Sequence, residues 1–192
     1  MFSRRSFLGG AAASALVVPG KAHASKSEQQ ALIDRAMTGI DSDRFIDTHV
    51  HVIGNGAGGT GCTVHPRMTD LWSHPMDWIR FQVYTRASGI TDLERADQEY
   101  LEVLTQRVRA MPHQGRTFLL AFDGVYDKNG QARHDDTVFH TPTKHALEAA
   151  KADIRFAAVA SIHPYRKDAA EALHEAADEG AVAVKWLPNA MW

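Results

Sequence analysis

The sequence contains one cysteine, Cys62, among 192 residues. A single thiol excludes a disulfide within the chain and any zinc site that is built from several cysteines. The sequence also lacks an apolar run of the roughly 20 residues that a membrane-spanning helix needs. Its composition, with 44% hydrophobic and 23% charged residues, is that of an ordinary folded domain and argues against disorder.

Basic charge is also scarce. The chain has 21 lysine and arginine residues against 23 aspartate and glutamate residues. Residues 1–24 hold Arg4, Arg5 and Lys21 and no acidic residue, so the rest of the chain carries a net charge of about −5. No basic stripe runs along the sequence, and we therefore expect no nucleic acid partner.

Residues 1–24 resemble a twin-arginine export signal. Arg4 and Arg5 precede a modestly apolar stretch, and Ala22 and Ala24 supply a small-x-small cleavage site. The alternative, an amphipathic or membrane-spanning helix, is disfavoured because the apolar stretch is short and is interrupted by glycine and proline. We therefore expect a periplasmic or secreted protein that has no membrane contact after the signal is cleaved.

Four short apolar runs divide the mature chain. They are rich in Val, Ile, Phe and Ala, and each stops at a polar, Gly or Pro signal, which predicts buried parallel strands. Helical patterns occupy the connections, and this alternation predicts an α/β architecture. The predicted strands span 44–53, 116–125, 155–164 and 181–188, the helical patterns span 91–112, 141–153 and 166–180, and a linker or helix over 25–43 precedes them all.

The ends of two helices and one long insertion can also be predicted. Thr141 is the expected N-cap of the second helical pattern, with Pro142 at its first position, and Gly180 is expected to end the third. Residues 54–90 form a connection far longer than usual, which is typical of a lid or binding segment. Its aromatic residues predict a small core of its own; they are Trp72, Trp78, Phe81 and Tyr84.

A glycine-rich run follows the first predicted strand. Gly54, Gly56 and Gly59 fit the pattern G-x-G-x-x-G, which binds dinucleotides only where the third glycine opens a helix. Here Pro66 follows and no helical periodicity appears. The run is therefore interpreted as a flexible turn near the site rather than as a nucleotide-binding loop.

Two histidines lie one residue apart at the end of the first predicted strand, in the run FIDTHVHV. Residues two apart in a strand point to the same side, so Asp47, His49 and His51 share one face. Two imidazoles on one face at the end of a buried strand can hold one divalent metal ion between them. The pattern therefore favours metal binding over two histidines packed in a core.

Together with SIHPYRKDAAEAL and GAVAVKWLPNAM, this run resembles the amidohydrolase superfamily of metal-dependent hydrolases, and most closely its family 2 branch, over residues 44–191. The resemblance implies a TIM-barrel-like (β/α)8 fold with its chemistry at the carboxyl ends of the strands. A full barrel needs about 250 residues. We therefore expect residues 44–192 to form the amino-terminal half of such a barrel, truncated after about the fourth strand.

The resemblance also assigns residues to the site. His49 and His51 would be metal ligands, and Asp123, His163 and Lys185 fall at or near the ends of later strands. Lys185 is either a ligand, carboxylated in some members, or paired within the site with a carboxylate such as Asp123 or Asp47, or purely structural. Asp123, His163 and Arg166 are the candidate catalytic residues, and Arg166 either clamps a substrate carboxylate or solvates a helix start.

The expected cofactor is a divalent metal, zinc first and manganese or iron as alternatives. The resemblance implies hydrolysis of an amide, ester or lactone of a small molecule by metal-activated water. Two alternatives stay open: an inactive or binding half-barrel that self-associates or needs a separate carboxyl half, and a decarboxylase with the same metal site. The other histidines are expected in loops or on helix surfaces; they are His65, His74, His113, His134, His140, His145 and His174.

Overall fold

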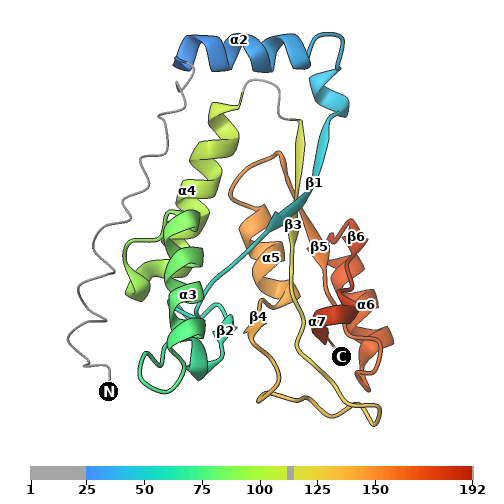
Figure 1. The fold of residues 1–192 in the computed structure, drawn as a ribbon. Helices are drawn as coiled ribbons and strands as arrows, with labels where there is room; N and C mark the ends of the chain where they lie inside the picture. Colours follow the sequence, from blue (N-terminus) through green and yellow to red (C-terminus); the bar gives the residue numbers. More distant parts are fainter. Residues whose placement is uncertain (1–24, 112–114, 192) are drawn as a thin grey trace, which may run out of the picture. The chain divides into compact units, whose positions relative to one another are not determined.

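The computed structural model describes residues 25–111 and 115–191, drawn in colour in Figure 1. The chain divides into two compact units, one ending at Gly39 and one beginning at Ile40. The predicted export signal, and His113, lie outside the described residues. Among the helices that are described, none is long and apolar enough to cross a membrane.

The first unit contains helix α2 (Lys26–Ala36), which lies within the segment where the sequence predicts a linker or helix. Its start is fixed by a capping box. The Glu28 amide donates to the Ser25 hydroxyl at 3.3 Å, and the Ser25 amide donates to the Glu28 carboxylate at 2.7 Å. Both hydrogen bonds provide acceptors for backbone amides that have no partner within the first turn of a helix.

The second unit is built on a parallel sheet. Strands β1 (Ile46–His51), β3 (Arg116–Leu120), β5 (Phe156–Ala160) and β6 (Ala183–Val184) lie in the order β1-β3-β5-β6. The sheet curls into a half-barrel, which is compatible with part of an α/β barrel (Figure 1). Each strand lies inside one of the four predicted apolar runs, so the mixed α/β architecture with a parallel sheet is confirmed.

Three helices cover one face of this sheet. They are α4 (Ala96–Ala110), which follows the short η3 (Leu93–Arg95), α5 (Thr143–Ala150) and α6 (Ala169–Asp178), and they follow one another across the sheet in Figure 1. Alternate strand residues pack against them, because successive side chains of a strand point to opposite faces. The resulting core joins Val52, Val108, Leu119, Ala149 and Phe156, and continues through Ala121, Ala146, Ala158, Ala160 and Ala176.

The long insertion differs from its prediction, because residues 54–90 contain the helix α3 (Pro75–Ser88). Proline at its first position and Gly89 in the left-handed conformation, with φ of 87°, bound the helix. Its aromatic residues follow no clean helical stripe, which hid the helix in the sequence. Phe81 is buried, but Trp72 is 92% exposed, so the prediction of a small core holding all four aromatics is wrong.

A second small sheet ties the insertion to the rest of the unit. Strand β2 (Thr63–Val64), just before η2 (Pro66–Met68), pairs antiparallel with β4 (Phe139–His140). This pairing also corrects the predicted start of α5, whose N-cap is Pro142. Thr141 instead forms a β-bridge to Phe122, and its hydroxyl donates to the carbonyl of Val52 at 3.0 Å. The remaining elements are η1 (Ser42–Arg44) and α7 (Pro188–Met191).

Candidate metal centre and strand-end network

The end of β1 presents its two histidines to the face of the sheet that the helices leave uncovered. Val50 and Val52 pack toward the helices in the core. His49 and His51 alternate with them and therefore point the other way, with ring centroids 5.1 Å apart. The phenol of Tyr100, on α4, donates to the carbonyl of His51 at 2.5 Å and fixes this strand end.

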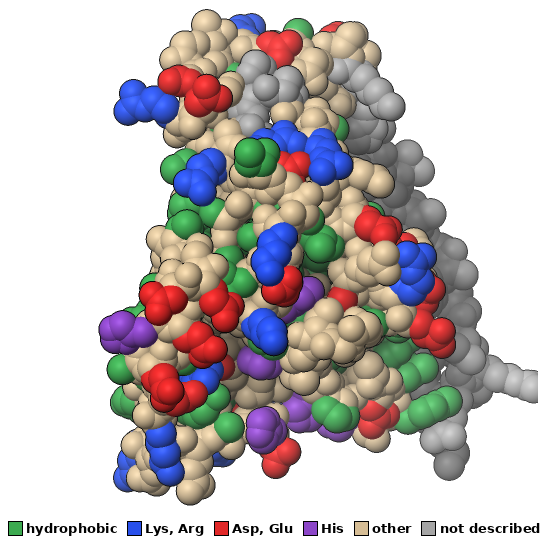
Figure 2. Space-filling view, turned by 180° about the vertical axis from the view of Figure 1, so that it is seen from behind, with side chains coloured by type: hydrophobic (Ala, Val, Ile, Leu, Met, Phe, Trp, Pro, Cys, Tyr) green, Lys and Arg blue, Asp and Glu red, His purple; other side chains and the backbone are tan. Residues whose placement is uncertain are grey.

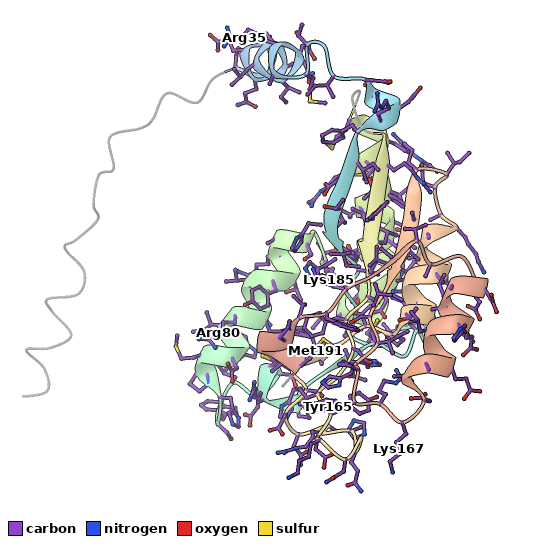
Figure 3. All side chains as sticks on the ribbon, turned by 90° about the vertical axis from the view of Figure 1, so that its right-hand side faces the viewer. Arg35, Arg80, Tyr165, Lys167, Lys185 and Met191 are labelled. Atoms are coloured by element: carbon purple, nitrogen blue, oxygen red, sulfur yellow. The ribbon has the colours of Figure 1, made fainter. Side chains whose placement is uncertain are left out.

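Lys185 joins the two histidines from the opposite edge of the sheet, where it directly follows β6. The Nε2 atoms of His49 and His51 lie 3.2 Å apart, and Nζ of Lys185 lies 3.4 Å from each of them. Figure 3 shows Lys185 at the level where the strands end. Three nitrogens from the two outer strands thus converge on one point.

The environment lowers the pKa of two of these groups. Burial, together with the nearby charges of Lys185 and His49, lowers the pKa of His51 to about 4. Burial also lowers the pKa of Lys185. Among the described contacts, the Lys185 side chain meets these imidazoles and no carboxylate, so the alternative in which it pairs with Asp123 or Asp47 has no contact behind it.

The two imidazole nitrogens suit a divalent metal ion in both chemistry and spacing, and the Lys185 amine has the same spacing but must lose its proton before it can bind the ion. Zinc binds nitrogen at about 2.0 to 2.1 Å in tetrahedral geometry, which places two nitrogen ligands about 3.3 Å apart. The observed separations of 3.2 and 3.4 Å match this spacing. His49, His51 and Lys185 are therefore the residues that fit a metal ion at the end of the sheet.

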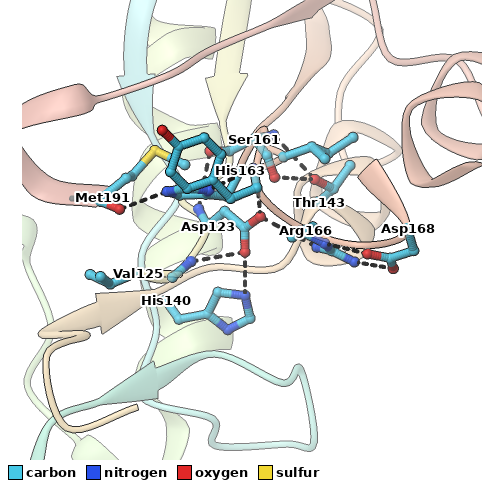
Figure 4. A network of polar contacts seen from close by, with 12 residues as sticks. Asp123, Val125, His140, Thr143, Ser161, His163, Arg166, Asp168 and Met191 are labelled. Atoms are coloured by element: carbon cyan, nitrogen blue, oxygen red, sulfur yellow. Dashed lines mark hydrogen bonds and ion pairs between the residues drawn. The ribbon is translucent and has the colours of Figure 1, made fainter. Parts of the chain in front are cut away.

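The three predicted catalytic residues meet in a second group, shown in Figure 4. The buried carboxylate of Asp123, just after β3, accepts from the backbone amides of His163 at 2.7 Å and Gly124 at 2.8 Å. Nη1 of Arg166 donates to it at 3.3 Å. Asp123 is therefore a well-bound anion that ties the ends of β3 and β5 together.

The other two members of this group are also engaged within the chain. Nδ1 of the buried His163 accepts from the amide of Tyr165 at 3.1 Å, which places the ring proton on Nε2, 2.7 Å from the carbonyl of Met191. Arg166 donates to both oxygens of Asp168, at 3.0 and 2.7 Å. Asp168 is the N-cap of α6, so this pair lies at the start of the helix, where one of the two alternatives for Arg166 places it.

Three cavities adjoin these groups, and the one of about 320 Å³ is lined by Asp123, His140 and Arg166. Another, of about 550 Å³, includes His51 and is mainly apolar; Phe81, Tyr84, Ile90, Phe122 and Phe139 line it. The third, of about 280 Å³, is lined by Asp123 together with His65, His134 and His140. Histidine side chains also gather in the lower half of the face shown in Figure 2. His134 lies in an exposed turn as expected, but His65 and His140 are partly buried.

His140 corrects its expected surface role most clearly. Its Nε2 lies 3.8 Å from Oδ1 of Asp123. Burial lowers the pKa of His140 and outweighs the opposing effect of Asp123, so the imidazole is neutral at neutral pH. Local spacing in the sequence does not predict this contact, because the chain after β3 meets the chain after β4 only through the isolated bridge between Phe122 and Thr141.

A third group of metal-ligating side chains was missed altogether by the sequence analysis. The thiol of Cys62, a carboxylate oxygen of Asp97 and a ring nitrogen of His145 lie within 4.8 Å of one another. His145 was expected on a helix surface, yet it is buried. Burial raises the pKa of Cys62 to about 11. The three residues are far apart in the sequence, so only the fold reveals this candidate metal-binding triad.

Comparison with known proteins adds no relative: no protein-family model, no curated protein and no solved structure matches the chain. The function must therefore be argued from the residues and from the geometry of these groups.

Proposed function

We propose that this protein is a metal-dependent hydrolase with a metal centre formed by His49, His51 and Lys185, in a fold related to the TIM-barrel-like amidohydrolases. The observation that carries the proposal is the convergence of three side-chain nitrogens, 3.2 and 3.4 Å apart, at the carboxyl end of a curled parallel sheet. Active sites of α/β barrels form at this end.

His51 and its neighbour Tyr100 have definable tasks in the centre. His51 is neutral at neutral pH and offers a lone pair without first losing a proton. Tyr100 holds the backbone of His51 and so limits how far the ring can move. Zinc, or manganese or iron, held by these nitrogens would supply a hydroxide from bound water near neutral pH.

The adjoining cavity indicates the kind of substrate. His51 lies at the border of a mainly apolar space of about 550 Å³, a size typical of small-molecule sites. An acyl or aryl group would rest against Phe81, Phe122 and Phe139, with its scissile carbonyl toward His51. Asp123, Arg166 and His163 would act beside this space by holding the strand ends, because their polar atoms already bind one another and nearby backbone groups.

Metal content and turnover test this proposal together. The purified chain, loaded with Zn²⁺ or Mn²⁺ and dialysed, is expected to hold one equivalent more than the His49→Ala/His51→Ala variant by elemental analysis. Loaded protein is expected to hydrolyse an aryl ester, a lactone or an anilide, and each single histidine substitution should lower kcat/KM at least 100-fold.

His174→Ala is the matched control, because His174 is exposed on α6 and its ring contacts only the Ala170 carbonyl among the described polar contacts. It should retain full metal content and activity. Unchanged metal content in the double variant would refute the metal centre. Metal bound at full stoichiometry with no turnover of any of the three probes would refute hydrolysis.

A second candidate is binding without turnover. Within the described residues, β1 and β6 each pair on one side only, so the sheet has two open edges. Open edges favour association with another chain. In that case the metal centre would form but remain catalytically inactive until a second chain covered the sheet.

A further inference from the structure

Cys62, Asp97 and His145 come from three different parts of the second unit. Cys62 closes the glycine-rich loop just before β2, Asp97 lies in the first turn of α4, and His145 lies in the first turn of α5. Their thiol, carboxylate and ring nitrogen atoms lie within 4.8 Å of one another. None of them belongs to the centre formed by His49, His51 and Lys185.

The imidazole of His145 lacks the partner that its burial demands. The residue is only 9% exposed, and its Nε2 is buried without a hydrogen-bond partner. A buried polar atom that makes no hydrogen bond costs about 1 to 3 kcal/mol. The ring also lies beside a thiol and a carboxylate. A bound ligand would therefore supply the partner that Nε2 lacks.

The carboxylate of Asp97 is held in position by the glycine-rich loop. Its Oδ1 accepts from the amide of Asn55 at 2.7 Å, and its Oδ2 accepts from the amide of Gly56 at 3.3 Å and from the Thr60 hydroxyl. Gly54 is required there, because a Cβ at this position would lie 2.3 to 2.6 Å from the carboxylate. A carboxylate offers about four lone-pair positions, so these three bonds leave one, which lies near the Cys62 thiol and can bind a metal ion once that thiol has lost its proton.

We propose that Cys62, Asp97 and His145 bind one zinc ion, separate from the strand-end centre, that clamps the glycine-rich loop to the first turns of α4 and α5. Thiolate sulfur, imidazole nitrogen and carboxylate oxygen are the ligand types that zinc takes in proteins. Zinc ligands lie about 3.3 to 3.7 Å apart, so small side-chain rotations complete the geometry. One water molecule fills the fourth position, and the thiol proton leaves to solvent as the metal binds.

Cobalt substitution tests this site selectively. Cys62 is the only cysteine in the sequence, so a thiolate-to-Co²⁺ charge-transfer band in the near ultraviolet can arise only from this site. Titration of the metal-free His49→Ala/His51→Ala variant, which lacks the strand-end centre, is expected to develop this band to saturation at one equivalent of Co²⁺. The band should persist in the His49→Ala/His51→Ala variant and disappear in Cys62→Ser and in His145→Ala.

The matched control is His174→Ala, which should keep the whole band. Zn²⁺ at 100 times its dissociation constant should raise the Tm of the His49→Ala/His51→Ala variant by about 5 to 10 °C. A folded wild-type chain that shows no charge-transfer band at saturating Co²⁺ would overturn the proposal, whether or not the variants fold. A band that survives Cys62→Ser would overturn it as well.

Discussion

Tyr100 illustrates how one side chain positions the candidate metal centre. Its phenol donates to the carbonyl of His51 at 2.5 Å, and burial raises its pKa to about 12, so it remains a donor across the usual pH range. We expect Tyr100→Phe to lower the free energy of unfolding by about 1 kcal/mol, because one hydrogen bond is lost while the ring still packs. Urea denaturation at an unchanged m-value would measure this.

Tyr84→Phe is the control for this prediction. Tyr84 is half exposed on α3, and its ring packs edge-on against Phe139, a contact that phenylalanine keeps. Its free energy of unfolding should change by less than about 0.5 kcal/mol. If both variants lose the same free energy of unfolding, the hydrogen bond from Tyr100 to His51 does not stabilise the fold.

Asp153 provides a pH-dependent prediction. Its buried carboxylate accepts from Nε of Arg155 at 3.0 Å and Nε of Arg109 at 2.8 Å, and these bonds, Arg155 first, hold its pKa well below the usual range. A carboxyl whose pKa is depressed in the folded state stabilises the fold above its unfolded value of about 3.9, and this stabilisation is lost as the pH falls below it.

The Asp153→Asn variant should therefore be less stable than the wild type by about 1 to 3 kcal/mol at pH 7. The difference should shrink steadily as the pH falls from 4 toward 2, because the unfolded wild-type chain takes up a proton on Asp153 in this range while the folded carboxylate stays ionised. Chemical denaturation across this range would measure it. A difference that stays constant with pH would mean that the charge on Asp153 contributes nothing.

At the scale of elements, the spacing of apolar residues in the sequence predicted the strands and helices whose formation depends on neighbouring residues. The apolar runs predicted the strands, and the apolar stripes predicted the helices α4, α5 and α6. These residues form the core in which the helices pack against the sheet. The side-by-side placement of His49 and His51 follows from the period of a strand. Helix α3 escaped prediction because its mixed aromatic and polar residues bury no continuous stripe.

Long-range contacts explain the other misses. Thr141 looks like a helix cap in the sequence, yet it forms an isolated β-bridge with Phe122. His145 lies on an amphipathic helix, and only the return of the glycine-rich loop brings Cys62 beside it. Contacts of this kind depend on how separate elements pack, which no local window of sequence contains.

The glycine-rich loop yields a prediction at this scale. Gly54→Ala would force a Cβ to within 2.3 Å of Asp97 and so push the loop away from α4. We expect the buried thiol of Cys62 to react with a disulfide reagent at least tenfold faster under native conditions, which corresponds to about 1.4 kcal/mol of easier local opening. Gly58→Ala is the control, because a Cβ at Gly58 meets no atom within 4 Å.

The two glycine variants separate packing from backbone strain. Gly58 has a φ of 79°, so alanine there costs backbone energy without disturbing Asp97. If both variants expose Cys62 to the same extent, the close approach of Gly54 to Asp97 does not hold the loop in place.

At the scale of the whole second unit, the curled sheet is covered by helices on one face and ends in two strands with unpaired edges. Among the described residues, β1 and β6 are each bonded to one neighbour only. Apolar side chains stay exposed along them, including Ile46, Val182, Val184 and Trp186. Unpaired edges that carry apolar side chains recruit further strands, so this sheet has the features that drive self-association.

Val184→Lys should therefore reduce self-association of the purified chain, because natural sheets block open edges with lysine. Light scattering after size exclusion, over a tenfold range of concentration, is expected to show a concentration-dependent mass for the wild type and a mass closer to the monomer for the variant.

Ile154→Lys is the matched control: Ile154 is 98% exposed between α5 and β5, away from either edge strand, and its substitution should leave association unchanged. A wild-type mass that stays monomeric at every concentration would show that the open edges are protected in solution, and the binding role without turnover would then lose its structural support.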